Sequence, residues 1–203
     1  MSTAVRKSPI AVFASGSGTN LQALLDYGKA HTEWPAKVAL VVSDKPQCLA
    51  VERARQSGVP VFAGEPRGYA DKAAFEADVL QHLRQHDVEW LVLAGYMRLV
   101  GPALLHTFPN RILNIHPSLL PHFPGRTAVR DALAAGVAKT GVTVHLVDEG
   151  IDTGQVIAQV TVPIPAGMTE AELLVRVHQV EHELYPATVS RVLSEWKTAG
   201  QAD

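Results

Sequence analysis

The sequence predicts an α/β protein with a Rossmann-like, mostly parallel twisted sheet that carries helices on both faces. Short runs of Val, Leu and Ile, typical of strands buried on both faces, alternate with helical segments. A glycine turn separates the first apolar run from the first helical pattern. Beyond residue 140 the alternation stops, which indicates a C-terminal antiparallel hairpin followed by a long final helix.

The expected elements follow from local patterns in chain order. Continuous apolar runs predict buried strands at residues 9–15, 36–44, 59–64, 88–96 and 111–116. Helical spacing of apolar residues predicts helices at 19–30, 46–58 and 69–86, and the end of a further helix at 131–136. Together these segments alternate in the order that a parallel sheet requires.

The C-terminal part has a different pattern of secondary structure. Residues 140–164 contain two strand-like runs around a glycine-rich turn, which predicts the hairpin. Residues 168–196 form one long helical pattern, and we expect Pro186 to kink or interrupt it, because proline cannot donate a helical hydrogen bond.

Composition excludes several classes of protein. The chain has 203 residues, 47% of them hydrophobic and 19% charged, with a net charge of −2, so no global field attracts nucleic acid or acidic membranes. The single cysteine, Cys48, excludes an intramolecular disulfide, and no apolar run approaches the ~18 residues of a membrane span. We expect one cytoplasmic domain over 1–203, with residues 1–7 as a flexible extension.

The glycine turn is a candidate anion site. Gly16 and Gly18 stand between the first strand and the first helix, where unobstructed backbone N–H groups suit a phosphate. Thr19 and Asn20 add a hydroxyl and an amide. The dinucleotide fingerprint would place a third glycine where Leu21 stands, and the lysine of a P-loop is missing, so the turn predicts phosphate binding without a cofactor signature.

A second candidate site closes the fifth strand. Asn114 and His116 alternate with apolar residues and therefore point to the same side of the strand. In an open α/β sheet, ligands bind beyond the carboxyl ends of the strands, where these two side chains lie. Pro117, Pro121 and Pro124 follow at once and restrict the exit loop, which favours a fixed orientation of the polar pair.

An acidic segment in the expected hairpin turn could complete this site. Asp148, Glu149 and Asp152 lie there among glycines, and a carboxylate folded over the sheet end could orient His116 or accept a proton. Spacing does not select one acid from the three.

The combined motifs resemble the folate-dependent formyltransferase family. The stretches "SGSGTNLQALL", "LAGYMRLVGPALL", "RILNIHPSLLPHFPG", "GVTVHLVDEGIDTGQVIAQ" and "VHQVEHELYP" occur in the family's order, from about residue 9 to about residue 195. The resemblance implies that Asn114, His116 and Asp152 form a catalytic trio. It also implies a cis bond between Leu120 and Pro121.

The resemblance further implies two binding regions. The phosphorylated substrate would contact Gly16, Ser17, Gly18, Thr19, Asn20, Pro117 and Glu181. The folate would contact Lys72, Met97, Arg98, Leu99, Val100, His145 and Asp148. Within the single domain, residues 9–100 would form the phosphate-binding half and residues 101–203 the catalytic and folate-binding half.

The implied reaction is transfer of the formyl group of 10-formyltetrahydrofolate to the amine of glycinamide ribonucleotide in purine synthesis, through a tetrahedral intermediate. The formyl folate would be a co-substrate, no metal would be needed, and the partners would be small molecules rather than nucleic acid or membrane. The protein would act as a monomer or homodimer. Methionyl-tRNA formyltransferase and formyltetrahydrofolate deformylase would share the trio, but the chain length and the glycine turn favour the ribonucleotide substrate.

Three remoter interpretations stay open on the residues alone. His178 and His182 in "HQVEH" match a zinc-protease pattern, although few residues remain to supply a third ligand. Asp44 after the second strand could hold the ribose of a dinucleotide in an oxidoreductase. The third is a non-catalytic nucleotide-binding module in which Asn114 and His116 only hold a ligand.

Overall fold

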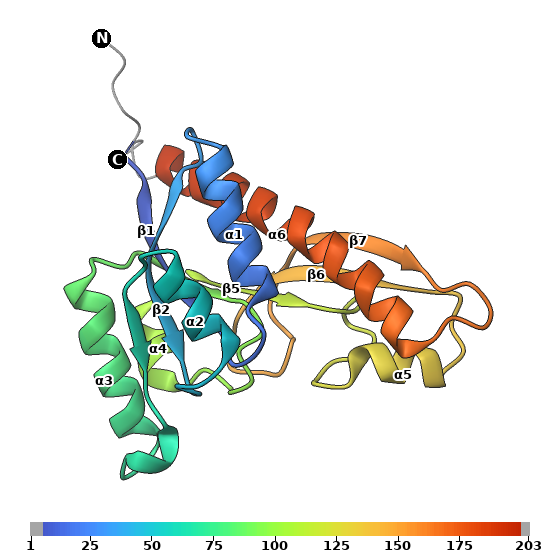
Figure 1. Ribbon diagram of the computed structural model, residues 1–203, viewed down its shortest axis with the longest axis horizontal. Coiled ribbons are helices and arrows are strands. Elements are labelled where there is room, and N and C mark those ends of the chain that lie inside the picture. Colours follow the sequence, from blue (N-terminus) through green and yellow to red (C-terminus); the bar gives the residue numbers. More distant parts are fainter. Residues whose placement is uncertain (1–5, 200–203) are drawn as a thin grey trace.

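A seven-stranded sheet forms the centre of the computed structural model, which describes residues 6–199 (Figure 1). The strand order is β3-β2-β1-β4-β5-β6-β7. The strands are β1 (Ser8–Phe13), β2 (Ala36–Ser43), β3 (Val61–Ala63), β4 (Trp90–Leu93), β5 (Ile112–His116), β6 (Lys139–Leu146) and β7 (Val156–Pro163). Strands β1 to β5 are parallel, whereas β6 and β7 form an antiparallel hairpin beside β5. The expected fold class is confirmed.

Helices cover both faces of this sheet. They are α1 (Thr19–Ala30), α2 (Leu49–Gln56), α3 (Lys72–Gln85), α4 (Pro102–Thr107), α5 (Ala128–Ala134) and α6 (Glu170–Ala199), with a short 3₁₀ turn at Pro66–Gly68. Apolar residues of α1, α2, α5 and α6 share one core cluster with the sheet, and those of α3 and α4 share the other. The central strands β1, β2, β4 and β5 are therefore mostly buried on both faces, which explains their continuous apolar sequences.

Two expectations about the elements were wrong. The long final helix α6 continues through Pro186 without interruption, because this residue is buried and its neighbours Tyr185 and Val189 are packed into the core. Trp34 Nε1 also donates to the Pro186 carbonyl oxygen at 3.3 Å. The strand expected at 88–96 stops at Leu93, because the chain leaves the sheet through Gly95, whose φ is +77°.

The strand order creates the position of the site. From β1 the chain builds β2 and β3 toward one edge, and then returns to place β4 and β5 on the other side of β1. The carboxyl ends of β1 and β4 thus flank a topological switch point, which is where open α/β sheets bind ligands. The glycine turn leaves β1 there, and Asn114 and His116 end the next strand, β5.

Other structural features bear on the sequence-based expectations. The Leu120–Pro121 peptide bond is cis, as the resemblance implied. None of the helices within residues 6–199 combines the length and the hydrophobicity that a membrane crossing demands. The extension expected over 1–7 lies mostly outside the part of the chain that the structure describes.

Gly18 is required by the backbone of the glycine turn. It caps α1 in the left-handed conformation, with φ +71°, and a Cβ at this position would lie 2.7 Å from Ala50 Cα. Gly16 differs, because a Cβ there would meet nothing within 4 Å. Only Gly18 is therefore demanded by both conformation and packing.

We predict that Gly18→Ala lowers the free energy of unfolding by about 1–3 kcal/mol, because alanine strains the left-handed backbone and collides with α2. Gly16→Ala is the matched control and should change it by less than about 1 kcal/mol. Urea unfolding of both variants measures the difference, and equal losses in the two would contradict this account.

Candidate active site

A cavity of about 640 Å³ opens at the carboxyl ends of β1, β4 and β5. Its wall combines the glycine turn, the loop after β4, the end of β5, the turn of the β6–β7 hairpin and one face of α6. Every site residue expected from the sequence lines it except Lys72. The Lys72 Nζ instead lies 3.9 Å from Glu76 Oε1 on α3, and its side chain is 42% exposed.

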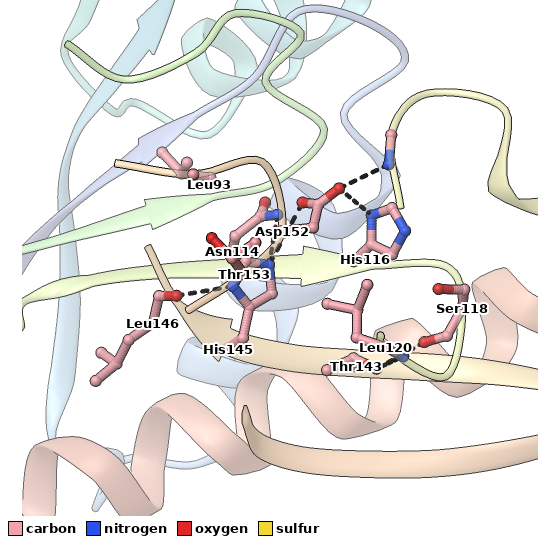
Figure 2. Close-up of polar contacts among 12 residues, drawn as sticks. Leu93, Asn114, His116, Ser118, Leu120, Thr143, His145, Leu146, Asp152 and Thr153 are labelled. Atoms are coloured by element: carbon pink, nitrogen blue, oxygen red, sulfur yellow. Dashed lines mark hydrogen bonds and ion pairs between the residues drawn. The ribbon is translucent and has the colours of Figure 1, made fainter. Parts of the chain in front are cut away.

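His116 is held between two acceptors. Its Nε2 donates to the Phe123 carbonyl oxygen at 2.9 Å. Its Nδ1 lies 3.4 Å from Asp152 Oδ2 (Figure 2). The residue is only 5% exposed. Because both ring nitrogens face oxygen acceptors, the doubly protonated imidazolium satisfies both contacts at once. The site can therefore present a positive charge to the cavity.

Asp152 is the acid that the fold selects from the hairpin turn. Its backbone is left-handed, with φ +54°, and its Oδ2 accepts the Gly125 N–H at 2.8 Å. Its Oδ1 lies 3.6 Å from His145 Nε2. His145 lowers the pKa of the Asp152 carboxyl most, burial opposes this, and the Gly125 N–H and His116 lower the pKa further. The net pKa lies below its ordinary value, so this carboxylate is ionised at neutral pH.

Asn114 is oriented by His145 across the sheet. The two residues are register partners in the antiparallel β5–β6 pair, and Asn114 Nδ2 lies 3.1 Å from His145 Nε2. His145 Nδ1 donates to the Leu146 carbonyl oxygen at 2.7 Å, and Nε2 lies between Asn114 Nδ2 and Asp152 Oδ1. Nε2 accepts from Asn114 in the neutral ring, whereas a protonated Nε2 donates to the Asp152 carboxylate. One amide hydrogen of Asn114 is thereby used, and the other is available to an oxygen in the cavity.

The glycine turn offers donors to the same cavity. Within residues 6–199, no protein acceptor is found for the backbone N–H groups of residues 16–20, which open α1. Arg53 Nε braces the turn from behind by donating to the Ser17 carbonyl oxygen at 2.8 Å. Unpaired N–H groups at a helix start form an anion-binding site.

Glu181 joins α6 to this turn. Glu181 Oε2 accepts a hydrogen bond from Asn20 Nδ2 at 2.9 Å, and Glu181 is only 5% exposed. Burial raises the pKa of its carboxyl, although the bond from Asn20 and the proximity of His178 oppose the shift. When an anion-binding turn holds the phosphate of a sugar phosphate, a buried carboxylate beside the turn can accept hydrogen bonds from the hydroxyl groups of the sugar.

The loop after β4 is held at both ends by residues that the sequence analysis missed. Met97 N donates to Ser15 Oγ at 2.9 Å, and Gly101 N donates to Glu76 Oε1 at 2.7 Å. Burial raises the pKa of Glu76. The hydrogen bond from the Gly101 N–H is the largest of several weaker effects that lower this pKa. Between these anchors, Leu99 is 59% exposed, so the loop presents an apolar side chain at the rim of the cavity. An acid among the buried positions of α3 was the only signal for Glu76.

The structure also places the residues of the remoter interpretations. Asp44 is buried, accepts a hydrogen bond from Ser15 Oγ and does not line the cavity. His178 and His182 stack with ring centroids 6.2 Å apart, while Glu181 between them bonds to Asn20. Among residues 6–199, no group of three or more His, Cys, Asp or Glu side chains is placed to hold a metal ion.

The family model described as formyl transferase matches residues 8–189. The chain therefore belongs to the formyl transferase family, and the resemblance drawn from its motifs is confirmed.

Individual relatives show which formyl transferases the chain resembles. The chain is 49% identical over 183 residues to a phosphoribosylglycinamide formyltransferase of Bacillus subtilis, a match that covers 90% of this chain and 93% of the relative. The solved glycinamide ribonucleotide transformylase 1 of Geobacillus kaustophilus aligns with a TM-score of 0.90 and 53% identity, covering 93% of this chain and 100% of that one. The phosphoribosylglycinamide formyltransferase of Bacillus halodurans aligns with a TM-score of 0.89 and 49% identity, covering 92% and 96%.

We predict that Glu181→Gln stabilises the protein at neutral pH, because the raised pKa of Glu181 means that its charge opposes folding. The gain is expected above the ordinary carboxyl pKa of 4.5, on the order of 1 kcal/mol, and should disappear as acid protonates the wild-type group. Urea unfolding at pH 8 and pH 4 measures it. An equal loss of stability at both pH values would show that the charge does not oppose folding.

Proposed function

We propose that this protein transfers the formyl group of 10-formyltetrahydrofolate to the amine of glycinamide ribonucleotide. One observation carries the proposal: the anion-binding turn at residues 16–20 and the trio of Asn114, His116 and Asp152 open into one cavity. The names of the relatives from Bacillus subtilis and Geobacillus kaustophilus support the same reaction. We further infer a cytoplasmic protein, a monomer or homodimer, that acts on small molecules and not on nucleic acid or membrane.

The cavity suggests a place for each substrate. The phosphate would accept hydrogen bonds from the N–H groups of residues 16–20. The ribose hydroxyls would form hydrogen bonds with Glu181, and Pro117 would lie beside the glycinamide arm. The folate would lie on the loop of residues 97–100, with its ring system near the polar rim at His145 and Asp148. Lys72 stays outside this arrangement, because it does not line the cavity.

The two parts of the chain then have different tasks. Residues 9–100 supply the phosphate turn, and residues 101–203 supply the catalytic trio, with folate contacts drawn from both. Correct mutual placement of two bound substrates lowers a bimolecular barrier by on the order of 7 kcal/mol or more.

The proposed chemistry is direct attack. The neutral amine forms a bond to the formyl carbon, which becomes tetrahedral and carries an oxyanion. The free amide hydrogen of Asn114 donates to this oxygen, and one such donor is worth about 3–4 kcal/mol in the transition state. The imidazolium of His116, whose two N–H groups face Phe123 and Asp152, adds a positive charge beside the oxyanion. Asp152, ionised at neutral pH, accepts the proton that leaves the amine. The bond from carbon to N10 breaks as N10 takes up the proton that Asp152 accepted, which returns Asp152 to its ionised form. Because the amine attacks the formyl carbon directly, no covalent enzyme intermediate forms.

We predict that the wild-type protein forms formylglycinamide ribonucleotide from the two substrates and releases little formate when the amine substrate is omitted. A coupled assay with and without glycinamide ribonucleotide measures both rates. Formate release at the same rate in both reactions would instead identify a deformylase, in which water replaces the amine.

We predict that Asp152→Asn lowers kcat by about 10²–10⁴-fold, because the amide cannot accept the proton of the attacking amine. Circular dichroism should show an intact fold, since asparagine can still accept the Gly125 N–H. Unchanged turnover in a folded Asp152→Asn protein would remove Asp152 from proton transfer.

A further inference from the structure

The ring of His116 depends on a loop that touches no other part of the proposed chemistry. Its Nε2 acceptor is the carbonyl oxygen of Phe123, at 2.9 Å, and Phe123 has a left-handed backbone with φ +53°. This residue ends the loop of residues 118–123, which does not line the cavity. A shift of the loop would therefore move the carbonyl that fixes the ring, without touching a bound substrate.

Two side chains of the hairpin hold this loop. Thr143, on β6, donates its hydroxyl hydrogen to the Ser118 carbonyl oxygen at 2.6 Å and accepts the Leu120 N–H at 3.1 Å (Figure 2). Gln159, on the edge strand β7, donates from Nε2 to the Leu120 carbonyl oxygen at 2.8 Å and to Thr143 Oγ1 at 2.9 Å. We call Thr143 and Gln159 the loop clamp.

The hydrogen bonds of the clamp are saturated and directional. The Thr143 hydroxyl uses its one hydrogen and both lone pairs, and the Gln159 amide uses both hydrogens. Thr143 is fully buried, so losing any of these hydrogen bonds would leave a buried polar group without a partner and would lower the stability of the fold. Gln159 is exposed on its strand, and a substitution there leaves the core intact.

The register of the sheet connects the clamp to the reacting centre. Thr143 is the antiparallel partner of His116 in the β5–β6 pair, and Gln159 is the partner of Thr143 in the β6–β7 pair. One row across three strands thus carries the imidazole, the hydroxyl and the amide. This row of residues fixes the position of the loop of residues 118–123 relative to β5, the strand that carries His116.

We propose that Gln159 and Thr143 are positioning residues for His116, because they hold the Phe123 carbonyl on Nε2 and thereby keep Nδ1 directed at Asp152. This inference rests on the proposed function. Neither clamp residue lines the cavity, so loss of the clamp lowers kcat and leaves the KM of each substrate unchanged. A small misplacement of a catalytic group is costly, since about 1 Å can lower a rate by about 10²-fold.

The first test compares Gln159→Met with Thr161→Val. Met has the length of Gln but donates no hydrogen bond, and the exposed Thr161 on the same strand makes no side-chain hydrogen bond within residues 6–199. We expect Gln159→Met to lower kcat about tenfold, with KM for both substrates within twofold, and Thr161→Val to behave as wild type. A wild-type kcat in Gln159→Met, or a kcat loss matched in Thr161→Val, would overturn the inference.

A second test reads the ring without using activity. In ¹⁵N spectra of His116, the wild type is expected to show a protected Nε2–H, and Gln159→Met should weaken that protection. Thr143→Ser keeps the hydroxyl and should retain the protected signal, whereas Thr143→Val should lose it. Unchanged His116 signals in folded Gln159→Met protein would overturn the inference. Absence of formyl transfer in the wild type would instead refute the proposed function, and the spectra would still test the clamp.

Discussion

The ion pair between His116 Nδ1 and Asp152 Oδ2, 3.4 Å apart, is the interaction on which the site depends. It joins the carboxyl end of β5 to the turn of the β6–β7 hairpin, two segments that α5 and β6 separate in the chain. The pair holds the acidic turn over the sheet end and places the Asp152 carboxylate beside the imidazole of His116. Without it, the turn would be a solvated loop of acids and glycines, and the cavity would lose one wall.

The change from parallel to antiparallel strands makes this pair geometrically accessible. A parallel strand after β5 would end at the same edge only after another helical crossover, whereas β6 runs back beside β5 and β7 returns again. β6 ends beside Leu113, so the hairpin turn folds back along β5 to bring Asp152 to His116 and to line the cavity. Register then pairs Asn114 with His145 and His116 with Thr143, so each polar side chain of β5 has a polar neighbour on β6.

Local patterns were sufficient to predict the sheet, most of its helices, the glycine turn and the pair at residues 114 and 116, because these follow from the periods of a strand and a helix. They could not select Asp152 among three acids, because that choice depends on how the turn folds over the sheet. The helix α4 escaped notice because it is only six residues long and follows a Gly-Pro pair. Glu76, Ser15 and Gln159 were missed for a common reason: each acts through a backbone group far away in sequence, and no local pattern encodes such a partner.

The surroundings of the two carboxyl groups in the cavity shift their pKa values in opposite directions. Glu181 has few donors around it, and burial raises its pKa, whereas Asp152 has two imidazoles and an N–H group, and its pKa falls. Asp152 is thus the carboxylate that stays charged and able to accept a proton. On this difference we propose proton transfer for Asp152 and substrate contact for Glu181.

A double-mutant cycle on kcat tests the central claim most directly, with His116→Ala, Asp152→Asn and the combined variant assayed for formyl transfer. If the two side chains act as one unit around the reacting carbon, the combined variant turns over within about threefold of the slower single variant. Losses that multiply in the combined variant would show that the two groups act independently, and the account built on their contact would be wrong.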